Sequence, residues 1–425
     1  ADPRMGKTLV STDLLESWGT KRNLVVAPLV VCPQWVNAAL AAGFTPVSLY
    51  PCGAKRIRGV LEASMGHSGR FVAVINYDKI HHAYEDLVRW DAQALILDES
   101  HYMKSPSAKR SRYARKLAER IDKVRLLSGI PAPNHYGDLW AQMAALSPKE
   151  WGSNRSFRLR YLITDPLWPS RVLGHRNEEE LLERVSHYAD FYRREDCFGA
   201  DSWQTVTRHV TLPPSARVIY ENLKQGLAAD LADGVQLTTT HLLQKITKLQ
   251  QAAAGFVLHD GETHHIHQAK LEAVEADLDE IAESGQKAVI FCKFIAETDA
   301  YAKLAAKYGT TYVIRGDKTP EQREEAIRAV EQDPGPIFVI CQIQAGGIGI
   351  SLRKCTHALF VSRDFSFSND LQARDRIYAR GEPKVVTYYQ ATKTIDNLIN
   401  VVLSRKENLH TMLQQKLVNL LKDST

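Results

Sequence analysis

The sequence predicts an α/β protein with two doubly wound parallel sheets and a helical insertion between them. Short apolar runs alternate with helical segments in residues 1–145, and the alternation returns in residues 276–425. Polar residues follow most of the apolar runs directly, as happens where parallel strands end at a ligand site. Residues 146–275 keep a helical periodicity but lose the strand pattern, which predicts the insertion and a linker.

The first region contains apolar runs that are short enough to be buried strands. A proline ends the first run, because proline cannot continue a hydrogen-bonded ladder. The predicted strands cover residues 23–28, 71–77, 95–97 and 124–129. The predicted helices cover residues 9–18, 32–42 and 104–121.

The helices and strands of the insertion and of the last region are predicted from the length and the hydrophobic period of each segment. In the insertion we predict helices at 181–192, 214–231 and 238–254. A polar hairpin is expected around His259, His264, His265 and His267, whose spacing matches no usual zinc signature. In the last region the predicted strands are 287–292, 311–314, 337–340 and 358–361. A helix is predicted to follow the first of these strands and to end at residue 307, and two more helices are predicted at 320–330 and 372–380.

Composition narrows the class of protein. A hydrophobic fraction of 44% and a charged fraction of 24% are typical of soluble globular proteins. The net charge is only +5, so any nucleic-acid affinity must come from a local basic stripe. The cysteines form no C-x-x-C pair, and Cys292 and Cys341 lie in apolar runs, which predicts reduced thiols and a cytoplasmic protein without structural zinc. Apolar runs stay well below about 18 residues, so we expect no membrane partner.

One predicted strand, residues 95–97, stops abruptly at two carboxylates, Asp98 and Glu99. At the carboxyl end of a parallel strand, Asp98 could hold the Mg²⁺ of a nucleotide, and Glu99 could orient or deprotonate an attacking water. A capped surface turn is the alternative interpretation of the same residues.

The first eight residues, ADPRMGKT, match the phosphate-loop pattern G-x-x-x-x-G-K-[ST] with Ala1 in place of the first glycine. Gly6 would let the backbone approach phosphate oxygens, Lys7 would reach the β- and γ-phosphates, and the Thr8 hydroxyl would bind Mg²⁺. The strand that should lead into the loop is absent, so we expect that the natural beginning of the chain is not included.

The second sheet has no phosphate loop of its own, and such a sheet commonly closes the nucleotide site of the first. Arg376 and Arg380 are four residues apart on the predicted helix and would share one face. An arginine supplied from a second domain can stabilise charge on the transferred phosphate. The alternative is a solvated basic helix.

The order of the motifs resembles that of superfamily-two helicase motors, most closely the Swi/Snf-type ATPases that translocate on double-stranded DNA, of the small bacterial or viral type. Further matches are the sequences QW at 34–35, NY at 76–77, DESH at 98–101, SGIPAPN at 128–134, YRR at 192–194, RGD at 315–317, GGIG at 346–349, NDLQA at 369–373 and TID at 394–396.

The resemblance implies two RecA-like lobes that use ATP and Mg²⁺ and carry a DNA duplex. Nucleotide binding would fall to Gly6, Lys7, Thr8 and Gly349, with Thr8 and Asp98 holding Mg²⁺. Catalysis would involve Lys7, Glu99 as the base, Gln372, Arg376 and Arg380, and His101 and Gln372 would couple the lobes. Contacts to the DNA backbone would come from Gln34, Trp35, Asn76, Ser128, Asn134, Lys293, Gly316 and Gln342.

The sequence also departs from the family pattern. Ile130 replaces a threonine of the third motif, and Ser351 replaces an asparagine after the glycine turn. The second arginine of the sixth motif falls on Ala379, so we rank Arg376 first as the arginine finger, with Arg380 as its substitute. Two alternatives to a translocase stay open: a strand-separating or annealing helicase on forks or RNA, and an inactive nucleotide-gated DNA-binding clamp.

Overall fold

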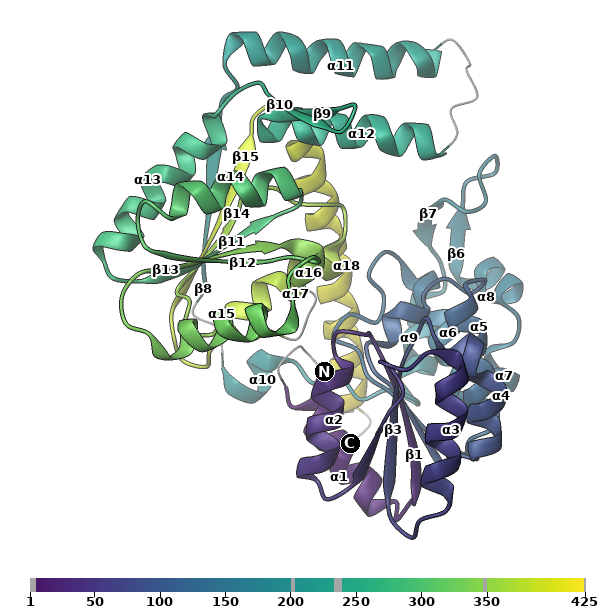
Figure 1. Ribbon diagram of the computed structural model, residues 1–425. Coiled ribbons are helices and arrows are strands. Elements are labelled where there is room, and N and C mark those ends of the chain that lie inside the picture. The colour runs from purple at the N-terminus through teal and green to yellow at the C-terminus, as the bar shows by residue number, and fades with distance from the viewer. Residues whose placement is uncertain (1–4, 200–202, 233–238, 347–349, 424–425) are drawn as a thin grey trace. The chain divides into compact units, whose positions relative to one another are not determined.

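The computed structural model describes residues 5–199, 203–232, 239–346 and 350–423 (Figure 1). It consists of two compact units. The first unit comprises residues 1–199 and 406–425, and the second unit comprises residues 200–405. The helix α18 (Ile395–Asp423) begins in the second unit and ends in the first. The insertion boundaries expected at 145 and 275 stay a prediction, because a division into two units does not define an insertion.

The first unit is built on a five-stranded parallel sheet. In spatial order its strands are β2 (Thr45–Ser48), β3 (Phe71–Asn76), β1 (Arg22–Ala27), β4 (Ala94–Leu97) and β5 (Lys123–Leu126). The central strand β1 aligns Leu24 with Ala73 of β3 and with Leu95 of β4. The carboxyl ends of β3 and β4 therefore lie on the same edge of the sheet as the end of β1.

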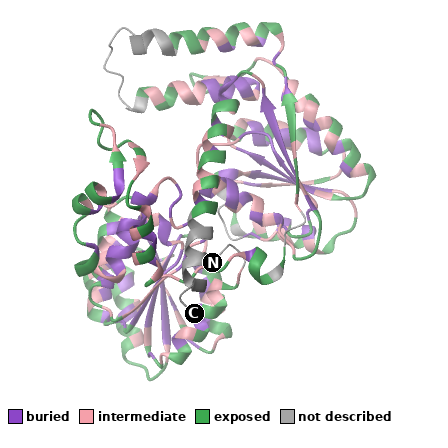
Figure 2. Ribbon diagram, turned by 180° about the vertical axis from the view of Figure 1, so that it is seen from behind, coloured by how far each residue is buried: buried purple, intermediate pink, exposed green. Residues whose placement is uncertain are grey.

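Helices cover both faces of this sheet. Leu24 and Val26 belong to one core cluster, together with residues of α3 to α6, whereas Val25 and Ala27 belong to another, together with residues of α1 and α2. The helices of the unit are α1 (Lys7–Ser17), α2 (Cys32–Ala41), α3 (Ala54–Met65), α4 (Ile80–Trp90), α5 (Lys109–Ala118), α6 (Trp140–Leu146), α7 (Pro148–Trp151), α8 (Asn154–Tyr161), α9 (Glu178–Ser186) and α10 (Arg194–Phe198), with 3₁₀ turns at Ser100–Met103 and Tyr136–Leu139. Figure 2 shows the buried residues concentrated in the strands.

The second unit contains a six-stranded sheet that is also parallel. Its strands, in spatial order, are β12 (Thr310–Ile314), β13 (Ile337–Gln342), β11 (Lys287–Cys292), β14 (His357–Phe360), β15 (Lys384–Ala391) and β8 (Trp203–Val210). The helices are α11 (Pro214–Ala232), α12 (Thr239–Ala254), α13 (Ala269–Glu283), α14 (Ile295–Ala305), α15 (Pro320–Gln332), α16 (Ile343–Gly346) and α17 (Phe367–Arg374), with a 3₁₀ turn at Asp375–Ile377.

A buried ion pair joins three elements of the second unit. The Lys270 amine donates hydrogen bonds to the Asp396 carboxylate and to the Val361 carbonyl, both at 2.8 Å, and the Lys270 side chain is 1% exposed. A buried amine of this kind is costly without such partners. Lys270 therefore ties α13 to α18 through Asp396 and to the end of β14 through the Val361 carbonyl.

The predicted fold class is confirmed, and the two sheets have helices on both faces as expected. The polar hairpin is also confirmed, as β9 (Phe256–His259) paired with β10 (Glu262–His265). Within the described residues, no group of three or more His, Cys, Asp or Glu side chains is arranged to hold a metal ion. Cys292 and Cys341 are buried free thiols, as predicted.

Other predictions of secondary structure were wrong. Residues 146–275 were expected to lose the strand pattern, but residues 203–210 form a strand, and the hairpin of β6 (Leu162–Thr164) and β7 (Val172–His175) stands out from the first unit in Figure 1. Residues 384–391, for which no element was predicted, also form a strand. The helix expected at 372–380 begins earlier, at Phe367, and its α-helical part ends at Arg374. None of the helices in the described residues has the length and apolar character needed to cross a bilayer.

Candidate nucleotide and nucleic-acid sites

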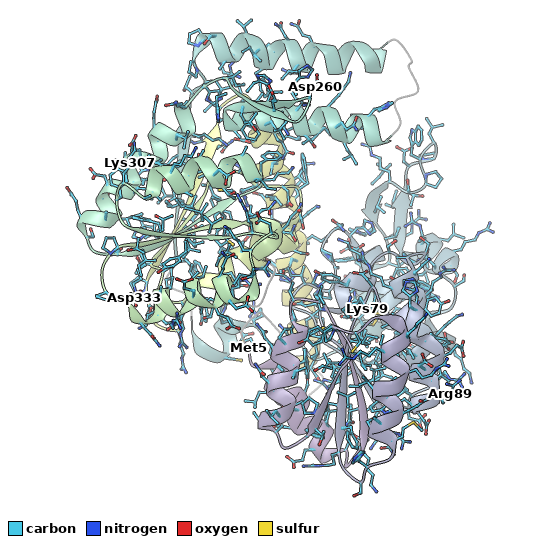
Figure 3. All side chains as sticks on the ribbon, viewed as in Figure 1. Met5, Lys79, Arg89, Asp260, Lys307 and Asp333 are labelled. Carbon is cyan, nitrogen blue, oxygen red and sulfur yellow. The ribbon has the colours of Figure 1, made fainter. Side chains whose placement is uncertain are left out.

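The phosphate-loop residues stand at the N-terminus of α1. Gly6 has φ +75° and ψ 21°, a left-handed conformation that glycine adopts without a steric penalty, and it directly precedes the helix that begins at Lys7. Lys7 and Thr8 therefore occupy the first turn, where backbone N–H groups without partners inside the helix favour an anion. In Figure 3, Met5, which precedes this turn, and Lys79, which follows β3, are labelled at the same end of the first unit.

Asp98 follows β4 and is almost completely buried, with 6% of its surface exposed. The indole Nε1 of Trp35 donates a hydrogen bond to Oδ2 of Asp98 at 2.7 Å, and the backbone N–H of Glu99 donates to Oδ1 at 2.9 Å. The buried hydroxyl of Tyr77 donates to the backbone carbonyl of Asp98 at 2.9 Å. Both carboxylate oxygens and the main chain are thus held by groups of the first unit.

The charge of Asp98 is opposed by its surroundings. Burial, and secondly the negative charge of Glu99, raise the pKa of Asp98 to about 6, whereas the Trp35 hydrogen bond and the positive charge of Lys7 act in the opposite direction. Lys7, at the start of α1, therefore lies close enough to Asp98, which follows β4, for its charge to lower the pKa of that carboxyl. A cation beside this carboxylate would favour its charged form.

Glu99 turns the chain sharply after the buried aspartate. Its φ of +48° and ψ of 51° are unusual for a residue other than glycine, and such strain persists only where neighbouring contacts fix it. Nδ1 of His101 lies 3.2 Å from Oε2 of Glu99 and 3.2 Å from the hydroxyl of Ser128. His101 thus links the predicted base to the segment that follows β5.

A second link between these two segments runs through Gln142, a residue that no sequence motif singles out. Ser100 donates from its hydroxyl to Oε1 of Gln142 at 2.7 Å, and Nε2 of Gln142 donates to the carbonyl of Pro131 at 2.7 Å. Beyond Pro131, the side-chain amide of Asn134 donates to Asp138 at 3.1 Å, and Lys406 donates to Oδ1 of Asn134 at 2.9 Å. The segment 128–134 is therefore anchored at both ends.

A cavity of about 450 Å³ adjoins this site within the first unit. Lys7, Ser100 and Ser128 contribute polar groups to it, but most of its wall is aliphatic and comes from β5, α6 and the end of α9. Triphosphate oxygens need hydrogen-bond donors and positive charge. Lys7 and Arg125 both line the cavity, but Arg125 pairs with Asp190, so the end near Lys7 suits a phosphate best.

The residues present fit a Mg²⁺ ion that arrives with a nucleotide. Mg²⁺ prefers hard oxygen ligands and commonly takes only one or two from the protein, keeping waters and phosphate oxygens for the rest. Asp98 offers a buried carboxylate whose charge lacks a full counter-charge, and Thr8 offers a hydroxyl at the helix N-terminus. These two residues are the candidates to hold the ion.

Of the DNA contacts predicted in the first unit, one needs correction. Trp35 is 0% exposed and its single polar atom binds Asp98, so its side chain cannot reach a DNA backbone in this structure. Gln34 is exposed, and Ser128 and Asn134 are half-buried. Asn76 is buried at the end of β3, and its Oδ1 has no hydrogen-bond partner among the described residues.

The DNA contacts predicted in the second unit gather at one edge of its sheet. Lys293 follows β11, Gly316 follows β12 and Gln342 ends β13, and these three strands are neighbours with parallel direction. Gly316 is exposed, Nε2 of Gln342 donates to the Lys293 carbonyl at 3.3 Å, and the Lys293 amine donates to Oε1 of Gln250. Burial lowers the pKa of Lys293.

The sixth-motif arginines do not share a helix face as predicted. Gln372 lies in α17, Arg376 lies in the 3₁₀ turn that follows, and Arg380 lies beyond that turn and is exposed. The argument from i, i+4 spacing is therefore wrong, because it assumed one continuous α-helix. Nη1 of Arg376 donates to the Ile350 carbonyl at 3.2 Å, while the predicted nucleotide contact Gly349 lies outside the described residues.

Two doubly wound parallel sheets, the first carrying a phosphate-loop lysine near the buried Asp98, define a protein of two RecA-like lobes with a candidate nucleotide site. Residues 2–253 match the model of the SNF2-related domain, and residues 269–381 match that of the helicase conserved C-terminal domain. The chain belongs to the SNF2-related family, within helicase superfamily two.

Among its relatives, the human DNA annealing helicase and endonuclease ZRANB3 is 26% identical over 74% of this chain and 29% of that protein. The TATA-binding protein-associated factor mot1 of Schizosaccharomyces pombe is 24% identical over 92% of this chain and 24% of that protein. The chain thus spans under a third of the length of either. The SWI2/SNF2 ATPase core of Sulfolobus solfataricus, solved with double-stranded DNA, is 19% identical, with a TM-score of 0.41, over 96% of this chain and 86% of the solved chain.

The hydrogen bond from Trp35 can be tested by replacing Trp35 with Phe. We expect the Trp35→Phe variant to lose about 1.5–3 kcal/mol of unfolding free energy, because a hydrogen bond to a charged group disappears. It should also need more Mg²⁺ for nucleotide binding, since Asp98 loses its orientation. Chemical denaturation and nucleotide titration at graded Mg²⁺ concentrations measure the two effects.

Trp18→Phe is the matched control, because Trp18 packs against the same core cluster. An unchanged Mg²⁺ requirement in Trp35→Phe, or an equal change in both variants, would contradict the role given to Trp35.

Proposed function

We propose that this chain is an ATP-dependent motor that translocates on double-stranded DNA. The observation that carries the proposal is the cluster of Lys7, Asp98 and Glu99 at one end of the first unit, with Asp98 within electrostatic reach of both neighbours. Membership in the SNF2-related family supports ATP as the nucleotide and DNA as the track. The description of the Sulfolobus structure names double-stranded DNA as the partner of that protein.

In this proposal each candidate site residue of the first unit has its own chemical role. The Gly6 backbone and the first turn of α1 bind phosphate oxygens, and the Lys7 amine neutralises their charge. Asp98 and Thr8 hold Mg²⁺, which when bound supplies further neutralisation of phosphate charge. Glu99 orients the attacking water and accepts its proton, and His101 fixes the Glu99 carboxylate from 3.2 Å away.

Coupling to DNA would pass through the segment 128–134. Ser128 contacts His101, and Gln142 joins Ser100 to Pro131. A movement of this segment on DNA would therefore displace the residues next to Asp98 and Glu99. The remaining predicted DNA contacts are small polar side chains, a lysine and backbone turns at strand ends, which suit phosphate oxygens rather than base edges.

One alternative is a strand-separating or annealing helicase, because the name of the human relative describes an annealing helicase. A strand-displacement or annealing assay separates that activity from translocation on an intact duplex. The other alternative, an inactive DNA-binding clamp, would be excluded if the protein showed sustained ATP hydrolysis that depends on DNA.

The first prediction from this proposal concerns the acidic pair. Glu99→Gln should keep nucleotide binding but lose DNA-stimulated hydrolysis by about 10²-fold or more, because the amide cannot take the proton of the water. Lys7→Ala should weaken both binding and turnover. Steady-state ATPase rates and nucleotide titrations provide the readouts, with Glu119→Gln on the exposed surface as the control. Wild-type turnover in Glu99→Gln would remove Glu99 from the mechanism.

A second prediction concerns the arginine finger, which we assign to the second unit. Arg376→Ala should reduce turnover by about 10³-fold or more with nearly unchanged nucleotide and DNA affinity, because a finger acts on transition-state charge. Arg380→Ala should be milder, and equally severe only if Arg380 has replaced the arginine missing at Ala379.

Arg353→Ala is the control for this series, because Arg353 is exposed and pairs with Glu331 on the surface. The assignment of the finger fails if Arg376→Ala and Arg380→Ala both hydrolyse ATP like the wild type.

A third prediction concerns the grip on DNA. Binding to duplex DNA should weaken steeply with salt, with a slope of roughly 0.9 per phosphate neutralised, and should differ little between unrelated sequences. Fluorescence anisotropy over a range of salt concentrations measures the slope. A preference of about 10³-fold for one sequence would contradict binding through the backbone.

A further inference from the structure

The β6–β7 hairpin takes no part in the site described above, yet it presents an ordered apolar tip to solvent. We propose that this hairpin is a second DNA-contacting element of the first unit, and that its tip stacks on unpaired bases where a duplex opens into single strands. The inference rests on the proposed function only in taking DNA as the partner.

The tip is the loop between the two strands, and hydrogen bonds fix its conformation. Oδ1 of Asp165 accepts the backbone N–H groups of Leu167 at 2.9 Å and of Trp168 at 3.2 Å. The backbone N–H of Arg171 donates to the Trp168 carbonyl at 2.8 Å, and the Arg158 guanidinium donates to the Pro169 carbonyl. A loop closed in this way holds its side chains in place before any partner arrives, which lowers the entropy cost of binding.

The side chains at the tip are apolar and lie in water. Leu167 is 84% exposed and Trp168 is 68% exposed, and Leu173 on the stem is 55% exposed. Single exposed apolar residues are common, but an exposed tryptophan beside a leucine on a fixed loop is a surface suited to a flat apolar partner. Residues 166–171 of this loop are all exposed, and Figure 2 shows exposed residues at the tip of the hairpin.

The charge of the hairpin and of α8, which leads into it, favours a polyanion as that partner. Residues 154–176 contain five arginines and a single acidic residue, Asp165. The arginines are Arg155, Arg158, Arg160, Arg171 and Arg176. Arg160 pairs with Glu180 and Arg171 with Asp165, so the charge of this group of five arginines is partly neutralised, but the net charge of the group stays positive. Phosphates bind to such stripes, and aromatic rings set among arginines suit bases.

The base of the hairpin is fixed to the turn Tyr136–Leu139, which directly follows the segment with proposed DNA contacts. The rings of His175 and Tyr136 stack with their centroids 4.3 Å apart, and Nε2 of His175 accepts the Tyr136 backbone N–H at 3.3 Å. Leu162 packs so closely on Gly137 that a Cβ atom there would lie 2.9 Å from its Cδ1. Tyr136 is two residues beyond Asn134, so the base of the hairpin packs on the turn that directly follows segment 128–134.

The geometry of DNA selects unpaired bases over an intact duplex. In a duplex the faces of the bases are covered by stacking, and a side chain reaches them only by prying a base step apart. Unpaired bases expose their faces, and stacking on an aromatic residue then needs no such distortion. A tryptophan at the tip of a projecting hairpin therefore favours a junction between duplex and single strand.

The test compares Trp168→Ala with wild type on two DNAs that share one duplex: a blunt form and a form with single-stranded extensions. Anisotropy at fixed salt gives the affinities, and 2-aminopurine at the first unpaired position reports contact with the base. We expect Trp168→Ala to lose about fivefold or more in affinity for the forked DNA, with little change on the blunt duplex. Trp168→Phe should retain most of the affinity, because phenylalanine keeps a stacking face.

Leu40→Ala on α2 is the matched control, since Leu40 is 64% exposed and lies outside the hairpin. Thermal melting should be unchanged in Trp168→Ala, because the side chain is not part of the core. Equal affinities of wild type and Trp168→Ala for the forked DNA overturn the inference, as does an equal loss on both DNAs. If wild type binds blunt duplex and hydrolyses ATP while Trp168→Ala matches it on forks, the hairpin inference fails and the motor function stands. A wild-type protein that binds neither DNA overturns both.

Discussion

A carboxylate that is almost removed from water must be held by hydrogen bonds or by opposite charge, and in the first unit that carboxylate belongs to Asp98. Trp35 and the backbone N–H of Glu99 occupy its two oxygens, and Tyr77 fixes its main chain. These partners come from α2, from the end of β3 and from the turn after β4. The order β3-β1-β4 in the sheet brings them together, so the fold of the unit and the position of the acid depend on each other.

The strained turn at Glu99 follows from the same constraint. Asp98 is buried, whereas the Glu99 carboxylate is partly exposed and lies beside His101, and a left-handed residue achieves that reversal in one step. His101 and Gln142 then connect the acidic pair to segment 128–134, where the predicted DNA contacts lie. The second unit uses a comparable device, because the buried Lys270 amine joins the end of β14 to the start of α18 through Asp396.

The sequence sufficed for the two sheets because their central strands are apolar runs buried on both faces, such as residues 287–292. It failed for β8, an edge strand whose residues are mostly exposed and polar, and for the short β6–β7 hairpin. It also failed where a local pattern was taken too far, since the arginine segment turns into a 3₁₀ turn after Arg374. The partnership of Trp35 with Asp98 spans 63 residues, and no spacing rule selects a donor at that distance.

The central claim is that this acidic pair and the phosphate-loop lysine serve ATP hydrolysis coupled to a DNA duplex. The most direct measurement is the steady-state ATPase rate with double-stranded DNA, single-stranded DNA and RNA supplied separately. The three nucleic acids are used at the same concentration of nucleotide residues, and ATP is kept constant. The account predicts a low rate without nucleic acid and the largest stimulation by double-stranded DNA. Equal or greater stimulation by RNA or by single-stranded DNA, or no hydrolysis under any of these conditions, would contradict it.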